Sequence, residues 1–463
     1  MAQKRRRIYL VSILGLLASC GTFRSLPDAS TLGLGNRSLR PYAVVGAHGA
    51  VDPATRERIS RRLSALGADN VLGRHLAAME SLSDTPLIAS NRVELLVDGP
   101  RAYAAMFAAI GAAHDHVNVE MYIFDEAQSA ARLLSDVLVE RARAGVAVNV
   151  LYDAVGSSDT PAALFDKLRA AGVELCAFNP LSPAANRTRK FTQRDHRKVV
   201  VVDGQVAFTG GINFSSTYSS GSRSKRSGAA DALRSGWRDT QIQVEGPATL
   251  QMQRLFFQSW GKQHCAAVRA ANYLPPARAA GATLLRLDAS SSDSQRNETY
   301  AAALTTVMFA QQSIDLTMAY FAPDEQLEQA LKEAARRGVR VRLLLAGVSD
   351  FRGILYAGRA HYASLLKAGV LIYEERRSLL HAKTLQVDGI WSTVGSANWD
   401  WLSFANNDEL NVVVIDTGFA TEMQTLFADD LRTATPITVA TWAQRSLRER
   451  LLERFWLTWD RFL

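Results

Sequence analysis

The sequence predicts an α/β protein built from two similar domains in tandem. The chain has 463 residues, more than a single hydrophobic core normally serves. Apolar strand-like runs alternate with amphipathic helix-like runs, an order typical of α/β units with largely parallel strands. The same order of elements occurs twice along the chain, which indicates duplication of one unit.

The composition limits the class of protein and of partner. Apolar residues make up 48% of the chain and charged residues 21%, which is typical of a folded globular protein. The net charge of +8 favours anionic partners, namely phosphates, nucleic acid or anionic lipid headgroups. Charge alone does not separate these three.

The first residues predict a targeting signal and not part of a folded domain. Basic residues 4–7 precede an apolar run, 8–18, that is too short to span a bilayer comfortably. The run ends Leu-Ala-Ser-Cys and resembles the bacterial lipobox, so we expect a signal peptide at 1–19 and lipidation of Cys20. Gly21 rather than Asp follows the cysteine, which favours the outer membrane of a Gram-negative bacterium, on its periplasmic side. An ordinary cleaved signal and an uncleaved anchor are the alternatives.

Residues 20–90 are predicted to form a tether followed by an N-terminal helical cover. The stretch 22–49 is rich in Gly, Ser and Pro, as flexible linkers are. Helices are expected at 53–66 and 71–82, packed on the first of the two domains.

A repeated motif organises the rest of the chain. The segments 196–213 and 381–398 share five features at one separation of 185 residues. The matching pairs are His196 with His381, Lys198 with Lys383, Asp203-Gly204 with Asp388-Gly389, Gly210 with Gly395, and Asn213 with Asn398. We therefore expect similar α/β domains at 91–266 and 291–434, with a linker at 267–290. A long active-site loop is expected at 218–238.

The motif spacing indicates which residues act together. Side chains on a strand alternate faces, so His196 and Lys198 point to the same side and can address one phosphate. Asp203-Gly204 lies between two apolar runs, a strong hairpin signal, and Asp388-Gly389 repeats it. These two aspartates belong to the candidate catalytic motifs, but we expect them to stabilise the turns without touching the substrate.

Small-residue turns follow each hairpin and are candidate phosphate-binding sites. Glycine lets backbone approach a phosphate closely, and amide and hydroxyl groups donate hydrogen bonds to its oxygens. The candidate side chains are Asn213, Ser396 and Asn398. The first half has Gly211 where the second has Ser396, so these contacts are not expected to be symmetric.

The doubled His-x-Lys-x4-Asp pattern with Gly-Gly/Ser-x-Asn downstream resembles the phospholipase D superfamily. The resemblance runs from about residue 91 to 434, and VEMYIF at 119–124 and the segment 391–414 are similar to bacterial cardiolipin synthases. It implies two α/β/α sandwich domains with pseudo-twofold symmetry and one active site at their interface. It also implies covalent catalysis by His196 and His381, with His196 as nucleophile by analogy. The lysines would balance phosphate charge, so neither a cofactor nor a metal ion is expected.

Each imidazole also needs an acid to hold it. The candidates for histidine-orienting residues are Asp239 and Glu409, which lie 43 and 28 residues after the histidine of their own half. The longer first interval contains the predicted loop.

The resemblance predicts a phosphatidyltransferase that makes cardiolipin from phosphatidylglycerol, with phosphatidylethanolamine as a possible donor. Phospholipase D-type hydrolysis, a nuclease and a non-catalytic lipid-binding lipoprotein are the alternatives. Basic residues suited to a nucleic-acid backbone are Arg187, Arg189, Lys190, Arg194 and Arg197, and they suit an anionic membrane equally well. The expected membrane anchor weighs against nucleic acid as a partner, and no partner protein is indicated.

Two further features leave alternatives open. Residues 435–463 form a predicted amphipathic tail, in which aromatic and leucine residues alternate with arginines. An interfacial membrane helix and a packed terminal helix both fit it. Cys176 and Cys265 can pair in an oxidising compartment, but the sequence does not decide whether they do.

Overall fold

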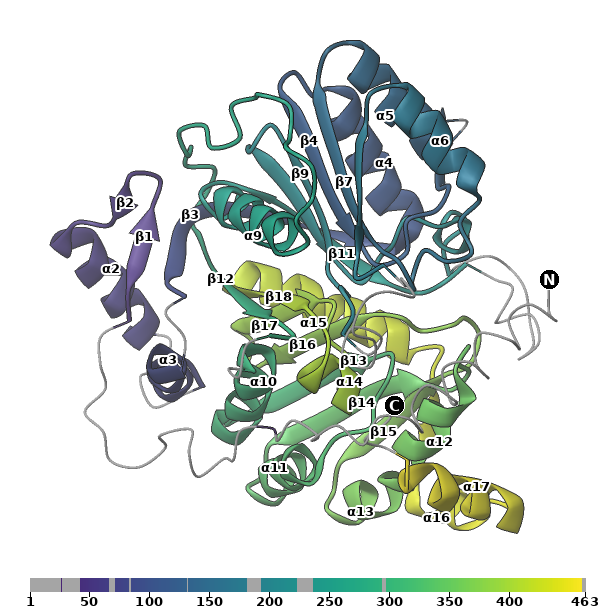
Figure 1. Cartoon of the computed structure of the whole chain (residues 1–463). Helices are drawn as coiled ribbons and strands as arrows, with labels where there is room; N and C mark the ends of the chain where they lie inside the picture. The colour runs from purple at the N-terminus through teal and green to yellow at the C-terminus, as the bar shows by residue number, and fades with distance from the viewer. Residues whose placement is uncertain are drawn as a thin grey trace.

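The two halves of the protein lie one above the other, and each is built around a β-sheet (Figure 1). The computed structural model describes residue 26 and residues 42–65, 71–82, 85–130, 132–180, 193–222, 236–293 and 297–459. The predicted signal peptide, Cys20, most of the tether and part of the predicted active-site loop lie outside these ranges.

One long strand, β3 (Leu87–Val97), belongs to both sheets. Its first residues pair with β12 (Thr283–Ser290) of the second half. From Arg92 onward it pairs with β11 (Thr240–Glu245) of the first half. The crossing point lies beside residue 91, where the sequence predicted the first domain to begin.

The two sheets repeat one strand order. The first runs β3–β11–β10–β9–β4–β7–β8, and the second runs β12–β18–β17–β16–β13–β14–β15–β19. The first-half strands are β4 (His116–Met121), β7 (Ala147–Asp153), β8 (Glu174–Phe178), β9 (Lys198–Val202) and β10 (Val206–Gly210). The second-half strands are β13 (Ser313–Met318), β14 (Arg340–Ala346), β15 (Leu371–Glu375), β16 (Lys383–Val387), β17 (Trp391–Gly395), β18 (Glu409–Ile415) and β19 (Thr435–Ile437).

The expectation of largely parallel strands was wrong. Only β4–β7–β8 and β13–β14–β15 pair in parallel, and the other ladders of the two sheets are antiparallel, apart from a short parallel pairing of β1 (Val44–Gly46) with β3. The cause lies in the motifs themselves, since β9–β10 and β16–β17 are hairpins and a hairpin is antiparallel. Each turn is tight: Asp203 and Gly204 have φ of 50° and 63°, and Asp388 and Gly389 have 52° and 67°. Positive φ at both central residues is what a type I′ turn requires.

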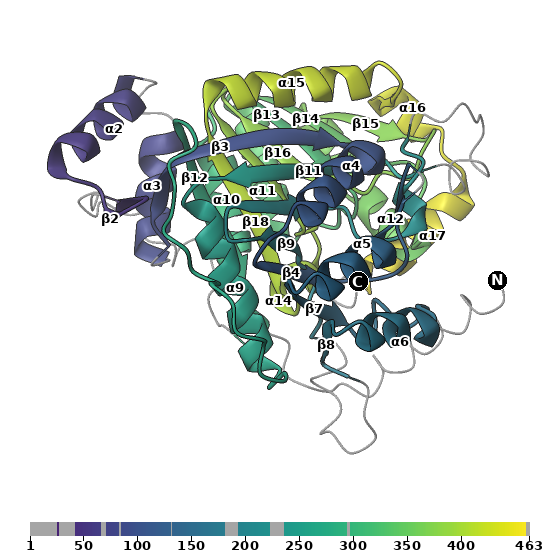
Figure 2. The ribbon, with the colours of Figure 1, turned by 90° about the horizontal axis from the view of Figure 1, so that it is seen from above.

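Helices cover both faces of each sheet. On the outer face of the first sheet pack α4 (Asp98–Gly111), α5 (Leu134–Arg143) and α6 (Ala162–Ala170). On the second sheet the same layer contains α10 (Glu298–Phe309), α11 (Glu325–Arg336) and α13 (Tyr362–Lys367). Between the halves lie α9 (Ala248–Lys262) and α15 (Thr417–Leu431), seen from above in Figure 2.

A shared core joins the two halves. Val199 and Val201 of β9 pack with Val412 and Val414 of β18, whereas Val200 and Val202 pack into the first half's own core. Because both faces of β9 are buried, its sequence is apolar without alternation. The two halves therefore share a hydrophobic core and are not separate domains joined only by a linker.

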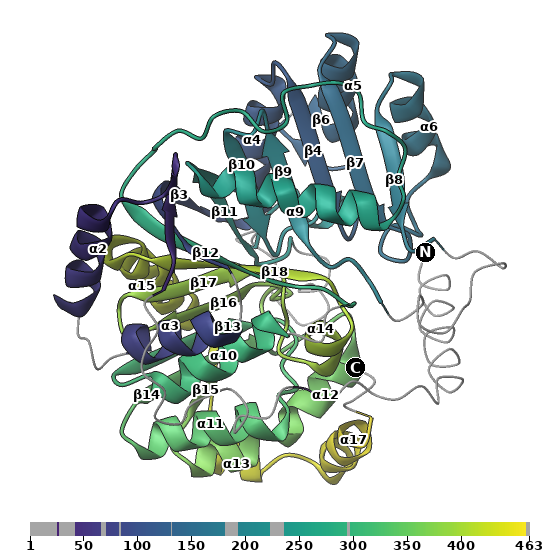
Figure 3. The same ribbon diagram turned by 60° about the vertical axis from the view of Figure 1, so that its left-hand side comes forward.

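The N-terminal helices pack on the second half, not on the first as predicted. They are α2 (Pro53–Ala65) and α3 (Val71–Leu82), and α3 lies alongside α10 (Figure 3). Leu76 and Met79 join the core of the second half, and the His75 ring lies 4.2 Å from the Trp391 ring. The order of the elements in the sequence did not indicate this arrangement, because the first residues of β3 belong to the second sheet and its later residues to the first.

Two predicted boundaries also move. Residues 283–290, predicted as linker, form β12 and pair with β18 along its length. The predicted tail begins with β19, which pairs with β15, and continues as α16 (Val439–Ala443) and α17 (Leu447–Leu457). Both segments were hard to assign because neither strand contains the repeated motif.

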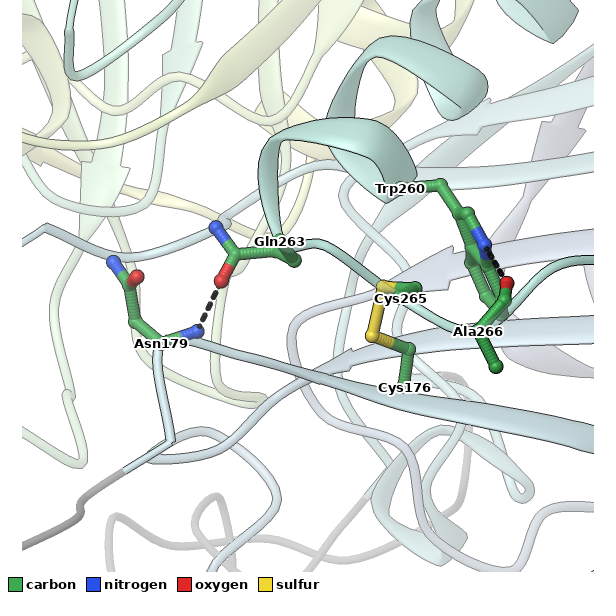
Figure 4. The surroundings of a disulfide bond; sticks show 6 residues. All are labelled: Cys176, Asn179, Trp260, Gln263, Cys265 and Ala266. Carbon is green, nitrogen blue, oxygen red and sulfur yellow. Dashed lines mark hydrogen bonds between the residues drawn. A yellow bond between two sulfur atoms is a disulfide. The ribbon is translucent and has the colours of Figure 1, made fainter.

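Cys176 and Cys265 form a disulfide, with Cα atoms 5.7 Å apart (Figure 4). The bond joins β8 to the segment after α9, on the first half. Beside it, the Asn179 backbone N–H donates to Gln263 Oε1 at 3.0 Å, and Trp260 Nε1 donates to the Ala266 carbonyl at 2.9 Å. The sequence left open whether Cys176 and Cys265 pair, and in the structure they do.

Candidate active site

Each motif histidine is tied by its backbone to the opposite half. The His196 N–H donates to the carbonyl of Asp408 at 2.9 Å, and the His381 N–H donates to the carbonyl of Arg238 at 2.8 Å. Asp408 and Arg238 immediately precede Glu409 and Asp239 in the sequence. These reciprocal bonds bring each histidine beside an acid from the other domain.

The histidine–acid pairs therefore cross the domain boundary. His196 Nδ1 lies 2.9 Å from Glu409 Oε1, and His381 Nδ1 lies 2.7 Å from Asp239 Oδ2. All four side chains are buried. The sequence identified both acids, but it counted each from the histidine of its own half, whereas the structure pairs each with the histidine of the other half.

The two motif lysines lie in the same buried cluster. Lys198 Nζ donates to the carbonyl of His196, and Lys383 Nζ donates to the carbonyl of His381. Lys383 Nζ is also 3.0 Å from His381 Nδ1. Ammonium groups held this close to both imidazoles can balance the charge of a phosphate between them.

The motif aspartates lie at the far end of the motif strands. Asp203 accepts hydrogen bonds from the backbone N–H groups of residues 114, 115 and 116, each at 2.9 Å. Asp388 accepts three equivalent bonds from residues 311, 312 and 313. Their contacts are those of turn-stabilising residues, as their position in the turn suggested, and not those of groups beside the histidines.

The small-residue turns after the hairpins differ between the halves. Ser396 Oγ donates to Glu409 Oε2 at 2.5 Å, so its contact is with the acid that holds His196. At the matching place stands Gly211, where an added Cβ would lie 2.1 Å from Asp239 Oδ1. The second half holds its acid through a hydroxyl, and the first makes room for its acid by having no side chain.

The two candidate phosphate-binding asparagines also occupy structural positions. Asn213 Oδ1 accepts from the Ile123 N–H at 3.0 Å, and its Nδ2 donates to Tyr218 Oη at 3.2 Å. The Asn398 backbone N–H donates to Ser403 Oγ at 3.2 Å. All of these atoms are buried near the motif strands, and the phosphate-binding role of Asn213, Ser396 and Asn398 stays a prediction.

Several aromatic residues of the site were not found from the sequence. Tyr218 Oη lies 3.1 Å from His381 Nδ1, and the Trp237 ring lies 5.2 Å from the His381 ring. The Tyr122 ring meets the His196 ring edge-on at 4.9 Å, and the Tyr320 ring meets the His381 ring at 6.3 Å. No repeated signal marks them, because the first half contributes three of the four and their positions do not match across the repeat.

Comparison with known proteins agrees with this geometry. The family described as "Cardiolipin synthase, PLD-like domain" matches residues 106–223 and 304–431, which is one match to each half. A cardiolipin synthase of Geobacillus thermodenitrificans is 34% identical over 371 residues, covering 80% of this chain and 72% of that protein. The chain belongs to the cardiolipin synthase family of phospholipase D-like proteins.

Other relatives are consistent with this membership. Cardiolipin synthase A of Pseudomonas aeruginosa is 35% identical over 368 residues, covering 79% of this chain and 72% of that protein. Among solved structures, the phosphatidylserine synthase of Haemophilus influenzae superposes with a TM-score of 0.58 at 12% identity. It covers 83% of this chain and 98% of its own, so the fold of two phospholipase D-like domains is shared. As a member of this family, the chain is an enzyme of the phosphatidyltransferase and phospholipase D type.

Burial gives the two histidine–acid pairs of this family member different protonation. Burial lowers the pKa of His196 to about 4, while the pKa of Glu409 is held at about 2 by His196, Lys198 and Ser396 against the effect of burial. Burial raises the pKa of Asp239 to about 7 even though Lys383 opposes that shift. Near neutral pH, the first pair therefore consists of an ionised acid and a neutral imidazole, and the second sits close to a titration.

The lysines are also shifted towards neutrality. Burial lowers the pKa of Lys198 to about 7 and that of Lys383 to about 8, although Glu409 and Asp239 favour their charged forms. A phosphodiester anion bound beside them would favour the ammonium forms again. Both lysines would therefore be charged when an anion is bound.

Two basic residues that seemed suited to nucleic acid are buried. Arg194 lies against Asp153, and Arg197 donates to Ser259 Oγ, the Ser290 carbonyl and the Glu409 carbonyl. Arg197 thus links the first half to the second and presents no charge to solvent. The other three basic residues lie outside the described residues. Within the described ranges no three His, Cys, Asp or Glu side chains group as metal ligands would.

Proposed function

We propose that this protein makes cardiolipin by transferring a phosphatidyl group from one phosphatidylglycerol to another through a phosphohistidine. The observation that carries the proposal is the reciprocal pairing of two histidines with two acids across the domain boundary, with a lysine beside each. The cardiolipin synthase relatives support the choice of reaction.

In the first step, the imidazole of His196 attacks phosphorus through Nε2. The bond from phosphorus to the oxygen of the headgroup glycerol breaks, and His381 donates a proton to that oxygen. In the second step, His381 takes the proton from a hydroxyl of the incoming phosphatidylglycerol. That oxygen attacks phosphorus, the bond to His196 breaks, and the products are cardiolipin and glycerol.

The electrostatics support this order of roles. Ionised Glu409 favours a hydrogen on His196 Nδ1 and leaves Nε2 with its lone pair, which is what a nucleophile needs. Burial raises the pKa of Asp239 to about 7 and lowers the pKa of His381, so near neutral pH the proton of the pair can be gained or lost. This suits a pair that gives and then takes a proton. Symmetry alone would not have separated the roles.

The choice of acceptor decides between transferase and hydrolase. Water in place of the second lipid would give phosphatidic acid, and phosphatidylethanolamine could replace phosphatidylglycerol as donor. The nuclease alternative is weakened because Arg194 and Arg197 are buried in ion pairs and hydrogen bonds.

We further propose that the protein is a lipoprotein anchored through Cys20 on the periplasmic side, at the outer membrane. The Cys176–Cys265 pair fits an oxidising compartment such as the periplasm and leaves Cys20 as the third cysteine of the chain. Mass spectrometry of the mature N-terminus tests the anchor. A diacylglyceryl group on Cys20 is expected, and an unmodified N-terminus beyond residue 20 would contradict it.

Incubation of the purified protein with phosphatidylglycerol vesicles tests the reaction. Cardiolipin and glycerol in equal amounts are expected by mass spectrometry, and His196→Ala should give neither. Phosphatidic acid without cardiolipin would make the protein a hydrolase. An absence of lipid turnover, together with cleavage of nucleic acid that His196→Ala abolishes, would replace the proposal with a nuclease.

A further inference from the structure

The last helix, α17, is held in place through one face only. Its first turn is capped by Ser446 and Glu449 in a capping box. Glu453 is buried and bonds to Arg445 Nε at 3.0 Å, and Trp456 lies over the backbone of Gly353, where an added Cβ would meet its ring at 3.0 Å. These contacts fix the orientation of α17 on α12 (Arg352–Ala360), as Figures 1 and 3 show.

The opposite face of α17 is apolar and exposed. Leu447, Leu451 and Phe455 are 75%, 69% and 54% exposed, and they follow one another at intervals of four residues. Such spacing places them in one stripe along the helix, because four residues turn it by only about 40° more than a full circle. We call these three residues the α17 stripe. Soluble surfaces rarely align three large apolar side chains without a partner.

Arginines flank the stripe on both sides. Arg450 and Arg454 lie along one edge and Arg448 along the other, by the helical period, and all three are exposed. The acidic residues of the helix, Glu449 and Glu453, are used in the cap and the buried ion pair instead. The outward face is therefore apolar in the centre and cationic at both edges.

This charge pattern selects among possible occupants. In a symmetric pair of chains the arginine edges would meet arginine edges, since the same patch is used twice. An anionic bilayer offers hydrocarbon to the stripe and phosphates to the arginines at the level of the headgroups. Within the described residues no helix is long and apolar enough to span a bilayer.

A series of packed side chains links the helix to the active site. Trp456 packs with Phe351 and Ile354 of the α12 region, and the same cluster includes Tyr320. Tyr320 Oη donates to Asp350 Oδ1 at 2.8 Å, and its ring meets the His381 ring at 6.3 Å. A membrane that meets α17 would thus meet the protein beside the site.

We propose that the α17 stripe docks the protein on an anionic phospholipid surface and sets the orientation in which the active site meets lipid. This inference deepens the proposed function and rests on it for the identity of the substrate. The docking contact itself does not depend on turnover.

A fluorescent probe on the stripe tests the docking directly. The full chain carries Cys20→Ser to remove the predicted lipidation site, and Leu451→Cys bears a bimane label. Vesicles of phosphatidylglycerol with brominated acyl chains should quench the label, since the stripe would lie among those chains. The matched control is a label at Leu274→Cys, which is 52% exposed. Its neighbours Tyr273 and Pro275 lie against His116 and Gly204 of the first half.

Three outcomes would overturn the docking proposal. They are no quenching at position 451, equal quenching at position 274, and quenching that is as strong with brominated phosphatidylcholine alone. Dimerisation in solution that Leu451→Gln abolishes, without quenching, would assign the stripe to a second copy of the chain.

Kinetics then separate docking from chemistry. The triple variant Leu447→Gln, Leu451→Gln, Phe455→Gln should lose turnover of phosphatidylglycerol vesicles by about tenfold or more. It should keep wild-type turnover of short-chain phosphatidylglycerol in solution, and Leu274→Gln should keep both. Equal loss on both substrates would overturn the docking role. If the wild-type chain turned over neither substrate, the proposed function would fail while the quenching result still decided the docking.

Discussion

The two halves of this protein share one strand order and one motif, yet they hold their acids by different means. Glu409 is fixed by the hydroxyl of Ser396 and is ionised, whereas Asp239 is fitted against Gly211 and has its pKa raised to about 7. Glutamate, the longer acid, accepts a hydrogen bond from a serine hydroxyl, whereas aspartate, the shorter acid, lies where a glycine leaves room for it. The comparison shows that the two copies of a duplicated fold can keep the same geometry while the pKa values of their acids differ.

The histidines give the largest expected effect. His196→Ala and His381→Ala should each lower transfer by at least about 10³-fold, because each removes a reacting group. They should differ with a phosphodiester whose leaving group needs no proton, such as a nitrophenyl ester. His381→Ala should then still form a covalent phosphoenzyme, detectable by intact-protein mass spectrometry, and His196→Ala should not. A phosphoenzyme in His196→Ala alone would reverse the assigned roles.

Exchanging the small residues of the turns should show the asymmetry next. Gly211→Ser should lower kcat by about 10²-fold or more, because the new Cβ would lie against Asp239 Oδ1 and displace the acid. Ser396→Gly removes one hydrogen bond to a charged group and should cost about tenfold. Thermal unfolding of both variants serves as the control for folding. Equal losses would mean that the two turns are equivalent.

The pH dependence should reflect both pairs. His196, with a pKa near 4, must be neutral to attack, so kcat/KM should rise with pH through about 4 and then level off. Above about pH 7 to 8 it should fall, as the Asp239–His381 pair and the two lysines lose protons. A short-chain substrate in solution gives the profile. Asp239→Asn should change the alkaline limb and leave the acid limb in place, and the opposite result would contradict the assignment.

The disulfide should produce the smallest catalytic effect and should separate the halves by stability. Cys176→Ser with Cys265→Ser should lower the free energy of unfolding by about 2–4 kcal/mol, since the bond closes a long loop of the first half. We expect kcat within about threefold of wild type, because the bond packs in a hydrophobic cluster with Phe178 and Phe256 that contains none of the site residues. Calorimetry and limited proteolysis check the prediction, and proteolysis that begins in the second half would be evidence against it.

The sequence predicted the parts of the site that repeat, together with the two acids, and missed the aromatic residues. His196, His381, both lysines and both turn aspartates stand at one separation, so the duplication itself marked them. Tyr218 and Trp237 have no counterpart at that separation, and nothing in their local sequence distinguishes them from packed aromatic residues.

The pairing between halves and the strand directions were also beyond the sequence. Glu409 lies closer to His381 along the chain, but the bonds from His196 to the Asp408 carbonyl bring it to the other histidine. This choice depends on how two sheets face one another, which no local pattern encodes. The position of α3 on α10 was missed for the same reason, because β3 visits both sheets.

The crossing of each histidine to the acid of the other half has a genetic consequence. A gene for either half alone would encode a histidine whose partner carboxylate lies in the other half, so a single copy of one half could not form either pair. A second copy of the first half would bring aspartate and glycine to the places that glutamate and serine occupy in the second, and so would change the acid that holds the first histidine.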